Sequence, residues 1–252
     1  MVLAWLALLD ALAAIAVAAA GIVAAHFAFT ASLFGFMLFV LGLLFAALAI
    51  ALAILAFIIM AFSVRARGAL AQAVLALILG LIVIVPTAVV FVNHRYPLIN
   101  DITSDTQNPP AFVHAQQLQP NPHRNMAYNR ATGAVQQAFP GYANLAPLRL
   151  DGTPDEVYRK AEIIAGEVPD WRITYRDPAA RTIEGVATSW LFRFKDDFVI
   201  AVRPDGPAAS LVDMRSKSRD GTGDLGANYH RIESFFAMMR GTPRGVTVPG
   251  AS

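Results

Sequence analysis

The chain has 252 residues, no cysteine, and a formal net charge of +2 from 20 basic and 18 acidic side chains. Without cysteine, disulfides, thiolate catalysis and cysteine metal sites are excluded. The near-balance of charge gives no electrostatic basis for binding nucleic acid, despite a pI of 9.1. The charges are unevenly spread, because residues 1–92 hold only Asp10, Arg65 and Arg67.

Three apolar runs predict a transmembrane region over residues 1–95. They cover residues 2–25, 32–62 and 69–92, and each exceeds the roughly 20 residues that a helix needs to cross a bilayer. A cleaved signal peptide is a poor interpretation of the first run, because no basic residues precede it. The sequence therefore predicts three spanning helices, with the lipid bilayer as the first partner.

The orientation is predicted from the short loop between the second and third runs. This loop carries Arg65 and Arg67, and basic residues in short loops favour the cytoplasmic side. The N-terminus is then cytoplasmic, and everything after Val92 is extracytoplasmic. Asp10 in the first run is interpreted as a protonated or hydrogen-bonded acid at a helix interface, or as one near enough to the inner surface to contact water, because the chain has too few intramembrane polar residues for an ion path.

Residues 96–150 are rich in proline, asparagine and glutamine, which favours extended or turning backbone over long helices. We expect this stretch to be a solvated connector. Its acids and histidines, Asp101, Asp105, His114 and His123, lack the i,i+4 helical spacing that pre-orients a pair of metal ligands. The sequence therefore predicts no metal site.

Residues 151–252 have the pattern of an α+β domain. A first helix is predicted from Thr153-Pro154-Asp155-Glu156, where Thr153 and Glu156 can cap each other's backbone. Turn signals separate the strands that follow, so neighbouring strands should be antiparallel. The expected fold is a four-stranded antiparallel sheet with two helices on one face. The predicted strands are 171–176, 181–194, 198–203 and 209–216, and the last helix is 225–240.

Strand alternation places several charged side chains on the side of the sheet away from the helices. They are either cross-strand ion pairs on a solvated surface or a recognition face for an anionic or polar ligand. Asp224 is expected to cap the last helix rather than act as a catalytic acid. The candidate ligand-binding residues, including three near the loop and helix that follow the last strand, are Arg193, Arg203, Asp213, Arg215, Arg219, Asn228 and Arg231.

Three stretches of this domain carry a family resemblance. They are FKDDFVI at 194–200, DMRSKSR at 213–219, and DLGAN at 224–228 followed by Arg231. With DITSD at 101–105 and NPP at 108–110, they resemble the bacterial domain of unknown function numbered 1499, over most of 96–240. Lys217 stands where a small residue is expected. The resemblance implies membrane attachment, which is frequent in that family, and it implies no activity. Together with the predicted topology, we expect a bacterial inner-membrane protein with a periplasmic or otherwise extracytoplasmic domain.

No catalytic residue, metal or cofactor is assigned. Ser189, Ser216 and Ser218 lack the Gly-x-Ser-x-Gly elbow, and the adjacent Asp196 and Asp197 should point apart. The favoured hypothesis is a binding or interaction module for an envelope lipid, glycan or protein, rather than an enzyme. The alternatives are an accessory or assembly subunit of a membrane complex and an envelope hydrolase. If the face binds a ligand, substitution of Arg215 and Arg219 should abolish binding and leave the fold intact.

Overall fold

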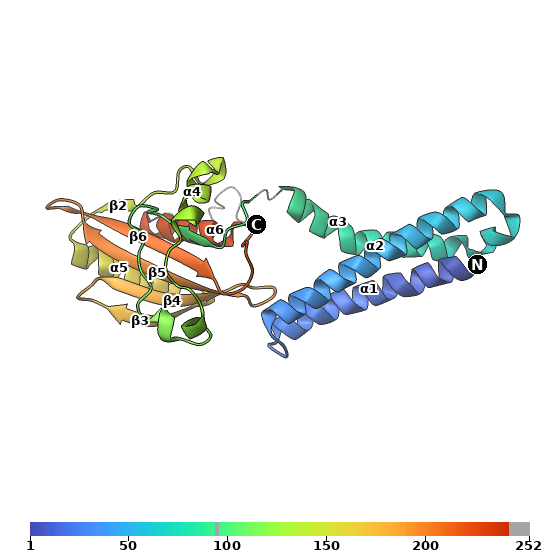
Figure 1. Ribbon diagram of the computed structural model, residues 1–252, viewed down its shortest axis with the longest axis horizontal. Helices are drawn as coiled ribbons and strands as arrows, with labels where there is room; N and C mark the ends of the chain where they lie inside the picture. Colours follow the sequence, from blue (N-terminus) through green and yellow to red (C-terminus); the bar gives the residue numbers. More distant parts are fainter. Residues whose placement is uncertain (94–95, 242–252) are drawn as a thin grey trace. The chain divides into compact units, whose positions relative to one another are not determined.

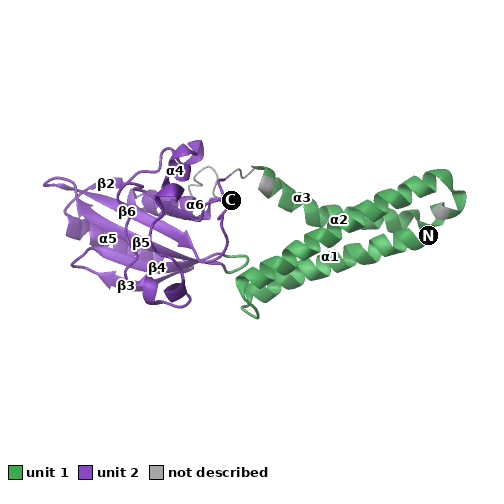
Figure 2. Ribbon diagram, viewed as in Figure 1, with its two compact units in different colours: residues 1–95, 190–193 green, residues 96–189, 194–252 purple. Residues whose placement is uncertain are grey.

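The structure is a computed structural model that describes residues 1–93 and 96–241. It divides into two compact units, which are coloured separately in Figure 2. The first contains the described residues of Met1–Arg95 together with Trp190–Arg193. The second contains Tyr96–Ser189 and the described residues from Phe194 onward.

The first unit consists mainly of three long apolar helices, as the sequence predicts. They are α1 (Val2–His26), α2 (Ser32–Phe62) and α3 (Leu70–Asn93), and the short helix η1 (Val64–Ala69) precedes α3. All three are long and apolar enough to cross a membrane. This result is compatible with the predicted membrane anchoring.

Small residues allow α1 and α2 to pack closely. A Cβ atom added at Gly42 of α2 would lie 2.7 Å from the Cβ of Ala18 and 2.8 Å from the carbonyl oxygen of Ala14. Such distances exclude any larger residue without movement of a helix, so glycine is required at this crossing. Asp10 of α1 has one buried carboxylate oxygen with no hydrogen-bond partner among the described residues.

The second unit is built on an antiparallel sheet with strand order β1-β6-β5-β4-β3. The sixth strand, β2, pairs with the other end of the β6 edge that β1 occupies. The prediction of four strands is therefore wrong. The strands are β1 (Asp101–Thr103), β2 (Leu148–Asp151), β3 (Trp171–Asp177), β4 (Thr182–Thr188), β5 (Lys195–Pro204) and β6 (Ala209–Ser218).

The two missed strands come from the stretch predicted as a connector. β1 has three residues and β2 has four, which is too short for an alternating pattern to stand out. They form because β6 extends to Ser218 and presents one long edge to both. Pairing with β1 and β2 provides hydrogen-bond partners for backbone N–H and C=O groups along this edge of β6, which would otherwise be unpaired within the sheet.

The helices α5 (Pro154–Glu167) and α6 (Ala227–Met239) cover one face of the sheet, which confirms that part of the prediction (Figure 1). Their apolar sides meet Phe198, Ile200 and Met214 of the sheet in the main core. The predicted capping box is present, because Thr153 accepts from the Glu156 amide and Glu156 accepts from the Thr153 amide.

The opposite face of the sheet is also covered. Residues 104–128, which we call the covering segment, cross this face with the short helices η2 (Ala115–Gln117) and η3 (Asn121–His123) (Figure 1). Phe112, Ala115 and Met126 of this segment form a small buried cluster with Val199 of β5. The domain therefore has three layers: the helices α5 and α6, the sheet, and the irregular covering segment on the opposite face of the sheet.

Residues 96–150 were expected to form a solvated connector. In the structure they belong to the compact second unit. After the covering segment the chain forms α4 (Arg130–Ala138) and the short helix η4 (Pro140–Tyr142) and then enters β2. Proline prevents long helices here, but it does not prevent irregular chain from packing on a sheet whose side chains accept its backbone hydrogen bonds.

The predicted second strand, 181–194, is wrong beyond Thr188, where β4 ends. The chain then forms a loop, closed by a hydrogen bond from the Ser189 amide to the Phe194 carbonyl at 2.8 Å. Arg193 lies in this loop with a φ of 59°. It is therefore not on a strand beside the other candidate residues.

Candidate functional site

The face of the sheet beneath the covering segment carries several buried charges. Burial of a charged side chain is costly unless it is paired and hydrogen-bonded. Each of these side chains meets that condition through contacts to the covering segment or to a neighbouring strand. They are Asp101, Glu184, Asp197, Asp213 and Arg215, from β1, β4, β5 and β6.

Arg215 is the centre of the first cluster and is only 1% exposed. Its Nε and Nη2 atoms each donate to a different carboxylate oxygen of Asp101, both at 2.8 Å. Nη2 also donates to the Met126 carbonyl at 3.0 Å, and Nη1 donates to the Pro110 carbonyl at 3.4 Å. Lys217 adds a second cation, with its Nζ atom 2.8 Å from Asp101. The contact between Arg215 and Asp101 is bidentate, which makes it strong and geometrically specific.

Two aromatic rings from the covering segment enclose the same guanidinium. Its central carbon lies 4.8 Å from the ring centre of Phe112 and 5.1 Å from that of Tyr128. Arg215 therefore ties β6 to β1 through Asp101 and ties both arms of the covering segment to the sheet. The expectation that this arginine lies on an open face is wrong.

Asp197 of β5 is the centre of a second cluster and is fully buried. Its carboxylate is 2.7 Å from Nη2 of Arg219 and 3.0 Å from Nη1 of Arg124. Asn121 donates to the same carboxylate at 3.0 Å. Arg219 also donates to the Gln119 carbonyl at 3.2 Å. Sequence reasoning missed Asn121 and Arg124, because nothing in a proline-rich stretch indicates which polar residue will meet a buried acid.

Glu184 of β4 holds the covering segment through backbone groups alone. One carboxylate oxygen accepts from the amides of Val113 at 2.6 Å and His114 at 3.0 Å. The other accepts from the amide of Ala115 at 2.6 Å. Sequence reasoning missed this residue too. The available signal was an acid inside a strand whose other residues are mainly apolar, Thr182–Thr188.

Asp213 and Arg203 form the third cluster at the far end of the face. Nε of Arg203 donates to Asp213 at 2.8 Å, and the hydroxyl of Ser104 donates to its other oxygen at 3.3 Å. Burial raises the pKa of the Asp213 carboxyl, and the contacts with Arg203 partly offset this effect. Arg203 also lies 3.5 Å from Asp105 of the covering segment, and its side chain is about half exposed.

Asn228 and Arg231 lie on α6, so they belong to the opposite layer. The hydroxyl of Ser216 donates to Asn228 at 2.7 Å, and Asn228 donates to the hydroxyl of Ser218 at 3.0 Å. Arg231 pairs with Asp196 at 2.5 Å. These contacts fix the start of α6 to the end of β6, and they do not join the clusters under the covering segment.

Asp224 accepts backbone amides at the start of α6, although it is not the N-cap residue that the sequence predicted. Its two carboxylate oxygens accept from the amides of Gly226 at 2.9 Å and Asn228 at 3.0 Å. The N-cap position itself is Gly226, whose φ of 85° suits glycine. Burial raises the pKa of the Asp224 carboxyl despite these amides, which lower it.

The structure thus divides the seven candidate residues into three groups. Arg203, Asp213, Arg215 and Arg219 share the covered face, Asn228 and Arg231 lie on α6, and Arg193 lies in the loop after β4. Their charged groups mainly bind other parts of the domain. Ligand binding by these residues remains a prediction.

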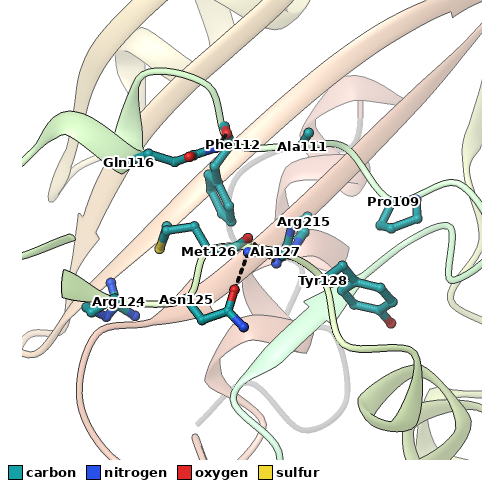
Figure 3. Close-up of a pocket in the computed structure, with 10 residues that line it drawn as sticks. All are labelled: Pro109, Ala111, Phe112, Gln116, Arg124, Asn125, Met126, Ala127, Tyr128 and Arg215. Atoms are coloured by element: carbon teal, nitrogen blue, oxygen red, sulfur yellow. Dashed lines mark hydrogen bonds between the residues drawn. The ribbon is translucent and has the colours of Figure 1, made fainter. Parts of the chain in front are cut away.

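A pocket of about 530 Å³ opens above Arg215 (Figure 3). Its walls are two stretches of the covering segment, residues 109–116 and 124–128, and the guanidinium of Arg215 lies at its base. The size falls within the range of roughly 300–1,000 Å³ that is typical of small-molecule sites. Within residues 1–93 and 96–241 there is no group of three or more acids and histidines that could hold a metal ion.

Fold and pocket together define a class of protein: three apolar helices joined to a layered antiparallel α+β domain with a small covered site. The chain belongs to the family described as protein of unknown function (DUF1499), whose model matches residues 101–239. The match runs from β1 to the end of α6 and includes the covering segment, which confirms the resemblance seen in the motifs. No curated protein matches the chain.

Proposed function

We propose that this protein is a membrane-anchored binding module that holds a small component of the cell envelope above Arg215. The pocket carries this proposal. Its two walls are fixed to the sheet from below, by Glu184 for residues 113–115 and by Arg215 for Pro110 and Met126. A site whose walls are held in place before the ligand arrives loses less conformational freedom on binding.

The side chains around the pocket favour binding over catalysis. The ten lining residues include no serine, histidine, aspartate or glutamate. Covalent or general acid–base catalysis needs such a nucleophile or base at the reacting atoms. The phenol of Tyr128 stays protonated at neutral pH and so has no free base form, because burial and the nearby Asp101 carboxylate raise its pKa to about 12. An envelope hydrolase is therefore the weaker hypothesis at this site.

We further propose that the three apolar helices span the bacterial inner membrane and that the binding domain is periplasmic. Arg65 and Arg67 lie in η1, between α2 and α3, where the positive-inside rule favours the cytoplasm. Fusion of alkaline phosphatase or a cytoplasm-dependent fluorescent protein to Ser252 tests this orientation. Only the phosphatase fusion should be active, and a fusion that fluoresces while the phosphatase is inactive would reverse the topology.

The binding function is tested by blocking the pocket at its rim. Ala127 lines the pocket and is exposed, so Ala127→Trp should fill the site and leave the buried contacts in place. The matched control is Ala179→Trp, at an exposed alanine in the turn between β3 and β4. Full-length proteins would be purified from native membranes in mild detergent, and bound small molecules would be extracted and identified by mass spectrometry.

We expect one molecule to accompany the wild type and Ala179→Trp, and to be lost from Ala127→Trp. Equal recovery from all three proteins would refute binding at this pocket. Repeated recovery of one membrane complex with all three, and no small molecule, would instead support the accessory-subunit hypothesis. Circular dichroism of each variant should match the wild type, so that loss of ligand is not loss of fold.

A further inference from the structure

We infer that the ligand of this pocket carries an oxyanion, either a phosphate or a carboxylate, and that Arg124 is the side chain that contacts it. This inference rests on the proposed binding function and specifies its ligand class. Three observations support it: an excess of positive charge at the pocket, a part-exposed arginine in its wall, and a set of lining side chains that supplies hydrogen-bond donors and no carboxylate.

Both arginines of the pocket belong to buried clusters that hold more cations than carboxylates. The third cluster lies at the far end of the face and contributes no lining residue. Glu184 adds one carboxylate beneath residues 113–115, and the cations still exceed the carboxylates by one. A recess lined by one sign of charge concentrates ligands of the opposite sign. The two clusters that meet the pocket hold four cations against two carboxylates: Arg124, Arg215, Lys217 and Arg219 against Asp101 and Asp197.

Arg124 is the cation that a ligand can reach. It lines the pocket and its side chain is 19% exposed, whereas Arg215 is buried and acts on a ligand only through its charge. A guanidinium has five N–H groups. Nη1 of this side chain donates to Asn121 and Asp197, and Nη2 donates to the Ser218 carbonyl. Its Nε and one N–H of Nη2 therefore have no partner among the described residues.

Arg124 can bind a second anion without giving up the first. The Asp197 carboxylate receives a bidentate contact from Arg219, with Nε at 3.1 Å from one oxygen and Nη2 at 2.7 Å from the other. Asn121 donates to the same carboxylate at 3.0 Å. One arginine therefore already neutralises this acid, and the charge of the second arginine remains for a ligand. Hydrogen bonds from a guanidinium to phosphate or carboxylate are among the strongest in proteins.

The other polar side chains of the lining are amides. Gln116 and Asn125 are exposed at the pocket, and the ten lining residues include no aspartate or glutamate. Oδ1 of Asn125 accepts from the Ala127 amide at 3.0 Å, so its Nδ2 donor remains for a ligand (Figure 3). Pro109 and the ring of Tyr128 supply apolar wall. An oxyanion attached to a compact organic group matches this combination of donors and apolar surface.

Two anions, each with an uncharged counterpart, test this inference. Glycerol phosphate is compared with glycerol, and N-acetylmuramic acid is compared with N-acetylglucosamine, which lacks the lactyl carboxylate. Saturation-transfer NMR measures their binding to the full chain in a polyoxyethylene detergent, which carries neither a charge nor a sugar. We expect at least one anion to bind with a Kd on the order of 1 mM, about tenfold more tightly than its counterpart, and more weakly as salt is added.

The two anions also distinguish the sources of the oxyanion. Tighter binding of glycerol phosphate indicates a phospholipid headgroup, and tighter binding of N-acetylmuramic acid indicates an acidic glycan. Both results support the inference. The molecule that is recovered with the wild type from native membranes should then carry the same kind of oxyanion.

Variants that change the charge at the pocket test the role of Arg124. Asn125→Asp adds a carboxylate at the rim and keeps an acceptor for the Ala127 amide, so the fold should be unchanged. Asn144→Asp is the matched control, at an exposed asparagine outside the lining. We expect anion binding to be about tenfold weaker in Asn125→Asp, at least as weak in Arg124→Gln, and unchanged in Asn144→Asp. If circular dichroism shows that Arg124→Gln is unfolded, Asn125→Asp decides.

The variants Ala127→Trp and Ala179→Trp separate this inference from the function on which it rests. Anion binding should be lost in the first and kept in the second. Uncharged probes that bind as tightly as the anions, and that fail to bind Ala127→Trp, would overturn the oxyanion inference and leave the binding function intact. The inference also falls if neither anion binds, or if Asn125→Asp binds the anions as tightly as Asn144→Asp does. Equal anion binding by Ala127→Trp and Ala179→Trp would refute the pocket itself.

Discussion

Replacing Arg215 with methionine is expected to lower the free energy of unfolding by about 3–5 kcal/mol, the usual cost of breaking a buried ion pair by removing one partner. The Asp101 carboxylate would remain buried with Lys217 as its one cation, and the carbonyls of Pro110 and Met126 would lose their donor. Because whole domains are stable by only about 5–15 kcal/mol, this is a large part of the margin. The structure therefore gives the opposite of the sequence-based expectation that Arg215 can be changed without disturbing the fold.

Chemical denaturation of the full chain in detergent, followed by tryptophan fluorescence, measures this loss. The matched control is Arg149→Met, because Arg149 is largely exposed and its pairs with Asp151 and Asp205 are surface pairs worth at most about 1 kcal/mol. The double variant with Asp101→Asn should lose less than the sum of its two single variants, because each single variant already removes the pair that Arg215 and Asp101 form with each other. Equal losses for Arg215→Met and Arg149→Met would contradict the structural role of Arg215.

Periodicity and capping signals were sufficient to predict the three apolar helices, α5, α6 and the four longest strands, but not α4. The three apolar helices follow from run length, and α5 follows from its capping box. Strand alternation also placed Asp213, Arg215 and Lys217 on one face, opposite Met214. These features depend on local sequence, because each side chain's direction is set by the backbone of its own element.

The covering segment could not be predicted, because its structure depends on contacts that are distant in sequence. Glu184 lies about 70 residues from the amides that it accepts, and Arg215 lies 114 residues from Asp101. A proline-rich stretch has no period that reveals a buried side, so residues 104–128 resemble a solvated linker in sequence. Because the covering segment could not be recognised in the sequence, the charged face was expected to be open, and the pocket was not predicted. Sequence alone therefore indicated Arg215, but neither its burial nor its pairing with Asp101.

Glu184→Ala is expected to release the covering segment while the sheet stays folded. Three backbone amides, those of Val113, His114 and Ala115, would lose their acceptor at once. A hydrogen bond to a charged group contributes about 1.5–3 kcal/mol, so the loss of even two would cost about 3 kcal/mol or more. That cost corresponds to an increase of roughly a hundredfold in the opening equilibrium of this segment. Hydrogen exchange of these amides, read by mass spectrometry of the full chain, measures the change.

The effect should be local, because the strands beneath keep their own ladder of hydrogen bonds. Exchange in β5 and β6 should change much less than exchange at 113–115. Glu162→Ala is the matched control, because Glu162 is part-exposed and pairs with Arg176 outside this face. Ligand binding gives a second readout, since the released residues 109–116 form one wall of the pocket. Uniformly faster exchange across the sheet would show that the covering segment is part of the cooperative core, and unchanged exchange at 113–115 would show that Glu184 does not hold it.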